Sequence, residues 1–251
     1  LDYETAFEKV KWLYDKEKEN LERCNESQLE DHFIKPVLRQ VLGHAFEVQA
    51  ESGRSALTPD YAFFPDDGTR TEALRSKGEK EFYSRAIAVG DAKKWGTPLD
   101  KKSGERAKYA QDNPSFQIDI YLRDTGLQWG ILTNGRYWRL YYEKTSHRLD
   151  SYFEVDLATI LDSNNKTDFG YFYLFFRKEA FLKGPDGKNL LQHAYDESYN
   201  YAKEVEDSLE RSVYRALKVL AQGFFVWPAN NLKSGSETIE LVHQNCLIFL
   251  Y

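Results

Sequence analysis

The chain has 251 residues, of which 41% are hydrophobic and 29% are charged, and its formal net charge is −6. This composition is typical of a globular protein, and no run reaches the roughly 18 apolar residues of a membrane-spanning helix. The net negative charge argues against a broad nucleic-acid-binding surface, but it allows a local basic stripe beside a cleft.

The cysteines indicate the redox state of the cellular compartment, and the first residue indicates whether the chain is part of a longer protein. Cys24 and Cys246 are the only cysteines, and neither lies at a zinc-binding spacing. We therefore expect no disulfide framework, no structural zinc and a reducing cytoplasm. Because residue 1 is Leu, we interpret the chain as a piece of a longer protein.

The first 45 residues predict two helices. Apolar side chains recur at helical spacing over Tyr3–Leu21, with charges between them. Ser27 and Glu30 have the spacing of a capping box, which predicts a second helix running toward Leu42. Gly43 would end it.

Short apolar or alternating runs, fenced by turn residues, predict strands. They are Phe46–Ala50, Tyr61–Phe64, Ala86–Ala92, Trp129–Thr133 and Tyr137–Tyr142. Asn134-Gly135, between the last two, favours a type I′ hairpin turn because both residues tolerate positive φ.

The segments between these strands predict helices. Thr69–Ser84 is charged and reads as a broken helix or a loop, and Asn113-Pro114 predicts an N-cap followed by proline, opening a helix to about Arg123. The order of elements predicts an α/β domain over residues 1–160, with a central mixed β-sheet flanked by helices.

Residues 161–251 predict a C-terminal α-helical segment. Helical periodicity covers Phe169–Phe181 and Asp196–Gln222, and Thr238–Tyr251 reads as an apolar helix. The apolar seam within 199–220 predicts a packing surface without chemistry.

Three charged residues near two predicted strands point to chemistry. Asp91 and Lys93 alternate with Ala92, so they share one side of a strand, about 6.5 Å apart. Asp60 precedes another strand, and if the two strands are neighbours, Asp60 and Asp91 converge on one divalent cation. Hard oxygen ligands suit Mg²⁺, with Mn²⁺ as a substitute. Lys93 would then stabilise the charge on a phosphate, as phosphodiester hydrolysis requires.

Gln117 and Tyr121 lie at i and i+4 of the helix that opens at Pro114, so they are neighbours on one helix face. This spacing lets both side chains face the cleft of the predicted site.

Together, Pro59-Asp60, Asp91-Ala92-Lys93 and Gln117-x-x-x-Tyr121 resemble the PD-(D/E)xK nuclease superfamily. The Gln-x-x-x-Tyr element is similar to that of type I restriction subunits and of single-chain type IIG and type IIL restriction-modification enzymes. Gly90–Trp95 and Thr125–Gly135 resemble the amino-terminal endonuclease part of those single-chain enzymes, and the match spans roughly residues 25 to 145.

The resemblance implies a restriction-endonuclease-like fold and a magnesium-dependent endonuclease of restriction-modification or phage defence in a prokaryotic cytoplasm. It implies metal binding by Asp60, Asp91 and the Ala92 backbone carbonyl, an approach of Glu30 to the metal, and catalytic roles for Lys93, Gln117 and Tyr121. Position 91 carries Asp where the family often has Glu, which shortens the ligand's reach by one methylene.

The expected partners also follow from the resemblance. They are double-stranded DNA, a methyltransferase and a specificity domain in the same longer chain, and a second copy that binds transiently for double-strand cleavage. Residues 161–251 would be the start of a helical connector. The DNA-contact candidates in the basic cluster after the site are Lys94, Lys101, Lys102 and Arg106.

Other interpretations stay open. Asp91 and Lys93 alone would fit a structural ion pair, and Glu30 is explained by its capping role. A catalytically silent DNA-binding or assembly module of the same fold is the main alternative. A nuclease acting on RNA or single strands is a weaker one, because the hydrolytic site does not choose between phosphodiesters.

Overall fold

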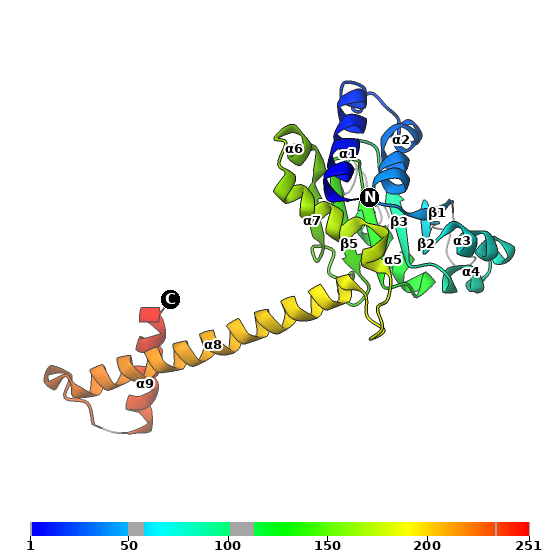
Figure 1. The fold of residues 1–251 in the computed structure, drawn as a ribbon. Helices are drawn as coiled ribbons and strands as arrows, with labels where there is room; N and C mark the ends of the chain where they lie inside the picture. The colour runs from blue at the N-terminus through cyan, green and yellow to red at the C-terminus, as the bar shows by residue number, and fades with distance from the viewer. Residues whose placement is uncertain (1, 50–57, 101–112, 234, 251) are drawn as a thin grey trace. The chain divides into compact units, whose positions relative to one another are not determined.

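A computed structural model describes residues 2–49, 58–100, 113–233 and 235–250. The chain divides into two compact units, Leu1–Leu191 and Gln192–Tyr251, which are considered separately (Figure 1). None of the helices in the described ranges has the length and apolar character that a bilayer crossing requires.

The first unit is built on a six-stranded mixed sheet in the order β1-β2-β3-β4-β5-β6. Its strands are β1 Ala45–Val48, β2 Tyr61–Phe64, β3 Ala88–Ala92, β4 Trp129–Thr133, β5 Tyr137–Tyr142 and β6 Phe153–Asp156. Only β3 and β4 pair in parallel, and the other neighbours pair antiparallel. The predicted α/β class, with a central mixed sheet flanked by helices, is confirmed, although the sequence did not predict β6.

Helices flank this sheet. The α-helices of the first unit are α1 Tyr3–Glu17, α2 Glu26–Leu29, α3 Asp67–Ala73, α4 Lys80–Ser84, α5 Pro114–Thr125, α6 Leu157–Asp162 and α7 Lys166–Phe176. Two π-helical stretches, η1 Glu30–Ile34 and η2 Val37–Val41, extend α2. The 3₁₀ turns of this unit are η3 Leu74–Ser76 and η5 Lys178–Phe181, and η6 Pro228–Asn230 belongs to the second unit. Residues 67–84 therefore form a broken helix, as predicted.

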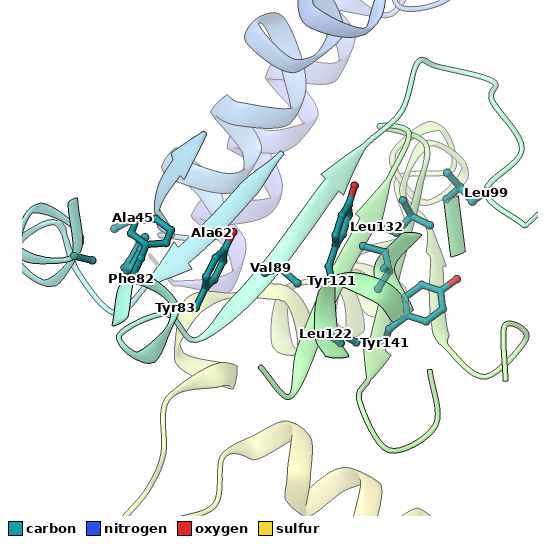
Figure 2. Packing of buried hydrophobic residues seen from close by; sticks show 13 residues of the cluster. Ala45, Ala62, Phe82, Tyr83, Val89, Leu99, Tyr121, Leu122, Leu132 and Tyr141 are labelled. Atoms are coloured by element: carbon teal, nitrogen blue, oxygen red, sulfur yellow. The ribbon is translucent and has the colours of Figure 1, made fainter. Parts of the chain in front are cut away.

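Apolar side chains cover both faces of the sheet. On one face, Ala62, Val89 and Leu132 of the strands pack with Tyr121 and Leu122 of α5 (Figure 2). The opposite face carries a mainly aromatic core shared with α1 and α7. It includes Phe7, Phe63, Trp138, Phe169 and Phe172. Alternation along the strands thus gives each face its own core.

The second helix begins two residues earlier than its predicted capping box implies. Asn25, not Ser27, is the N-cap: its side chain accepts from the Gln28 amide, and the Gln28 side chain accepts from the Asn25 amide. The capping role assigned to Glu30 was therefore wrong, and this carboxylate is available for another contact. Gly43, with φ of 76°, follows the helix as expected.

The β4–β5 hairpin is confirmed, but its turn is not type I′. Gly135 has a positive φ of 84°, whereas Asn134 does not. Asn134 instead accepts from the Arg136 and Tyr137 amides through its side chain. Asn113 caps α5 with Pro114 next to it, as predicted.

The first compact unit extends to Leu191, beyond the boundary expected at residue 160. The reason is α7, whose Phe169 packs against Phe7 of α1 and whose Phe172 packs against Trp138 of β5.

The second unit contains most of α8 Leu190–Val226 and all of α9 Ser236–Leu250, which confirms a helical C-terminal segment. Val242 and Cys246 of α9 are buried. Tyr199 and Leu209 of the predicted seam are exposed, so the seam is only partly covered.

His44 lies in the core between β1 and α7. Its Nε2 donates to the Phe176 carbonyl oxygen at 2.7 Å, and its ring packs against Phe63 and Phe181. Burial lowers the pKa of His44 to about 4. His44 is thus a buried core residue.

This burial predicts acid sensitivity. The unfolded chain takes up the His44 proton near pH 6.5 and the folded chain only near pH 4, so stability falls as the pH drops through this window. We expect wild type to lose about 3 kcal/mol more unfolding free energy than His44→Phe between pH 6.5 and 4. Urea titrations at several pH values measure this, and equal losses in both proteins would contradict it.

Candidate active site

The ends of β2 and β3 bring two carboxylates together. The register that pairs Tyr61 with Gly90 places Asp60 opposite Asp91. The Asp60 Oδ2 accepts a hydrogen bond from the Ala92 amide at 2.8 Å, which fixes this carboxylate against the end of β3. The sequence required these strands to be neighbours for the two aspartates to converge, and they are.

Asp91 and Lys93 lie on the same side of the strand end and form a close ion pair. Asp91 is only 2% exposed. Burial raises the pKa of Asp91 to about 7, against the opposing effect of Lys93, and the negative charge of Asp60 adds to the rise. Burial alone would lower the pKa of Lys93, but the attraction of Asp91 outweighs it and the net shift is upward. Lys93 is therefore held in its charged form.

Helix α5 covers this pair from one face of the sheet. The Tyr121 hydroxyl donates to Asp91 Oδ1 at 3.4 Å, and Gln117 lies one turn earlier on the same helix. The helix approaches β4 closely because Gly130 has no side chain: a Cβ there would lie 2.8 Å from Ile118. Tyr121 thus reaches the site as predicted, and Gln117 precedes it by one turn on the same helix.

The helix on the other face brings Glu30 toward the site. Glu30 Oε2 accepts from the Tyr61 hydroxyl at 2.5 Å and lies 3.6 Å from Lys35 Nζ. Burial raises the pKa of Glu30, the Tyr61 hydrogen bond opposes the rise, and the charge of Asp60 adds to it. Glu30 is thus within electrostatic reach of Asp60.

Sequence reasoning missed two residues beside the site. Glu26 Oε2 accepts from the Lys94 amide at 3.1 Å, and Tyr61 binds Glu30 from within β2. The i, i+4 spacing of Glu26 and Glu30 on one helix face was a usable signal for the first. No local pattern marked Tyr61.

The donor set suits a hard divalent cation. Asp60 and Asp91 offer carboxylate oxygens, and strand alternation directs the Ala92 carbonyl to the same edge as its amide, toward Asp60. Burial raises the pKa of Asp91 and the charge of Asp60 adds to the rise, and a cation between the two carboxylates would oppose both effects. Within the described ranges, no group of three or more His, Cys, Asp or Glu side chains is arranged to hold a metal. Without a cation, Asp60 and Asp91 are the carboxylates that converge at the strand ends.

One DNA-contact candidate, Lys94, lies within the described residues. Lys94 is exposed directly after the site, and its backbone is fixed by Glu26. Lys101, Lys102 and Arg106 lie outside the described residues.

Comparison of the chain with models of protein families, with curated proteins and with solved structures finds no match.

The Asp91–Lys93 ion pair predicts a pH-dependent loss of stability in Lys93→Met. This variant leaves a buried carboxylate without its cation, which costs about 3–5 kcal/mol. The pKa of Asp91 is already raised in the folded chain and would rise further, so the penalty grows as pH increases above the unfolded value and is larger at pH 8 than at pH 5.

Urea unfolding of wild type and variant at both pH values measures the effect. Asp91→Asn/Lys93→Met is the matched control, because it removes both charges and should recover most of the loss. An equal, small loss at both pH values would show that the pair does not matter for folding.

Proposed function

We propose that the chain is a metal-dependent DNA endonuclease domain of the PD-(D/E)xK type, from a restriction-modification or phage-defence enzyme. The observation that carries the proposal is the meeting of Asp60, Asp91 and Lys93 at the ends of two adjacent strands, beneath Tyr121. Two converging carboxylates and a charged lysine are the groups that metal-assisted phosphodiester hydrolysis needs.

Each residue has a role that follows from its contacts. Mg²⁺ held by Asp60, Asp91 and the Ala92 carbonyl would supply a water of lowered pKa and positive charge beside the phosphate. The Ala92 amide holds Asp60 in place, and the Tyr121 hydroxyl holds Asp91.

Lys93 stays protonated because of Asp91, so it acts as a hydrogen-bond donor to the phosphate and the attacking water rather than as a base.

The proposed partners follow from the same interpretation. One such site cuts one strand of DNA, so cleavage of both strands would need a transient second copy. Target recognition is assigned to a specificity domain and protection to a methyltransferase, both in the same longer chain.

One observation favours a second candidate function, a catalytically silent DNA-binding or assembly module. Asp91 is almost fully buried and already neutralised by Lys93, as in a purely structural ion pair. Metal binding separates the two functions, because a structural pair has no use for a divalent cation.

Cleavage tests the proposal directly. With Mg²⁺ and supercoiled plasmid, we expect Asp91→Asn and Lys93→Ala to lower the cleavage rate by at least about 100-fold while the circular dichroism spectrum stays folded. Lys166→Ala is the control, since this exposed lysine pairs with Glu8 on α1. Wild-type rates in the two site variants would refute the endonuclease function. Parallel assays on RNA and single-stranded DNA identify the substrate class.

Metal binding is the second test. An ion that binds only the folded chain should raise the free energy of unfolding by about 2.7 kcal/mol at 100 times its Kd. We expect Mn²⁺ to stabilise wild type in this way and to have no such effect on Asp60→Asn, as measured by urea unfolding. Equal behaviour of the two proteins would favour the silent module.

A further inference from the structure

Tyr61 occupies a fixed position directly behind the proposed site. It follows Asp60 in sequence and therefore points to the opposite face of the sheet. Its side chain is 1% exposed, with the ring stacked on Phe63 at 5.9 Å and edge-on to Phe46 at 5.3 Å. Because the ring is held on two sides, its hydroxyl presents a hydrogen-bond donor at one defined point.

That donor is used by Glu30. The hydroxyl donates to Glu30 Oε2 at 2.5 Å, a contact that joins residues 31 positions apart. Burial raises the pKa of Tyr61 far above its ordinary value, which keeps the hydroxyl protonated as a donor.

The helix that carries Glu30 is also fixed to the site one turn earlier. Glu26, at i−4 from Glu30, accepts from the Lys94 amide at 3.1 Å, just beyond Lys93. Glu30 opens the π-helical stretch η1, and wide turns of this kind occur often at functional sites. The helix therefore directs two carboxylates toward the ends of β2 and β3.

Tyr61 contacts Glu30 through a neutral group, and this distinguishes the contact from an ion pair. A neutral hydroxyl orients a carboxylate without cancelling its charge, whereas an ammonium at contact distance would neutralise it. Lys35 forms an ion pair with Glu30 at 3.6 Å and a shorter one with Asp31 at 2.7 Å, so its charge is shared between two carboxylates. Glu30 thus lies within electrostatic reach of Asp60. An orientation of this kind serves a carboxylate that receives a cation, since groups behind a metal ligand set its direction.

From these contacts we propose that Tyr61 is a positioning residue, which holds Glu30 beside Asp60 so that Glu30 joins Asp60 and Asp91 when a divalent cation binds. The inference rests on the function proposed above, and it adds a residue from the face of the sheet opposite α5.

The test is Mn²⁺ affinity measured by calorimetry on the 251-residue chain. Tyr61→Phe removes one hydroxyl and keeps the ring, and we expect affinity to fall by about 10-fold or more. Glu30→Gln should weaken binding at least as much, and Tyr61→Phe/Glu30→Gln no further than Glu30→Gln alone, because the two residues act through one contact.

Tyr141→Phe is the matched control. This tyrosine is also a fully buried strand residue, and its hydroxyl bonds Ser115 at 2.7 Å, away from the aspartates. We expect it to lower stability while leaving Mn²⁺ affinity unchanged, so a general loss of stability cannot imitate the predicted effect.

The possible results separate this inference from the proposed function. Unchanged affinity in Tyr61→Phe or in Glu30→Gln, with binding lost in Asp91→Asn, would overturn the role of Tyr61 and leave the endonuclease function standing. Wild type that binds no Mn²⁺ would overturn both. If Tyr61→Phe does not fold, Glu30→Gln alone decides the matter, because the role of Tyr61 requires Glu30 to contribute to affinity.

Discussion

The carboxylate of Asp91 is buried at the end of β3, and the side chains around it must compensate its charge. Asp91 is almost inaccessible to water, and such a charge is costly unless other groups compensate. Lys93 supplies the opposite charge and Tyr121 a hydrogen bond. The parallel β3–β4 pairing requires a crossover, and α5 is that crossover, so the same connection that builds the sheet also delivers Tyr121.

Glycines allow close packing on both faces of the sheet at this point. Gly90 lies next to Asp91 but on the opposite face, where a Cβ would come within 2.7 Å of the Phe63 ring. Gly130 likewise lets α5 approach β4, because a Cβ there would lie 2.8 Å from Ile118. Phe63 therefore closes the back of the strand behind Asp91, while Tyr61, two residues earlier, reaches Glu30. The end of the sheet is where side chains from both faces come within reach of each other.

The parts that the sequence predicted correctly are those with strong local signals. Asn113-Pro114 defines the start of α5, and strand alternation places Asp91 and Lys93 on one side. Asn25 was missed as a cap because Ser27 offered an equally good local pattern, and this error hid the role of Glu30. The Tyr61–Glu30 contact joins a helix to a strand through folding alone, so no spacing predicts it.

Under the proposed function, the negative charge of the site requires a cation to bind before the phosphate of DNA. The carboxylates of Asp91, Asp60 and Glu26 act on Lys93, in a chain of net charge −6. Glu30 lies within electrostatic reach of Asp60 and forms an ion pair with Lys35 at 3.6 Å. Such a concentration of negative charge repels a phosphate backbone and attracts a divalent cation. A cation that neutralises part of it removes the repulsion at the position where the phosphate must lie. Metal binding and DNA binding are then coupled through charge alone, without any movement of the chain.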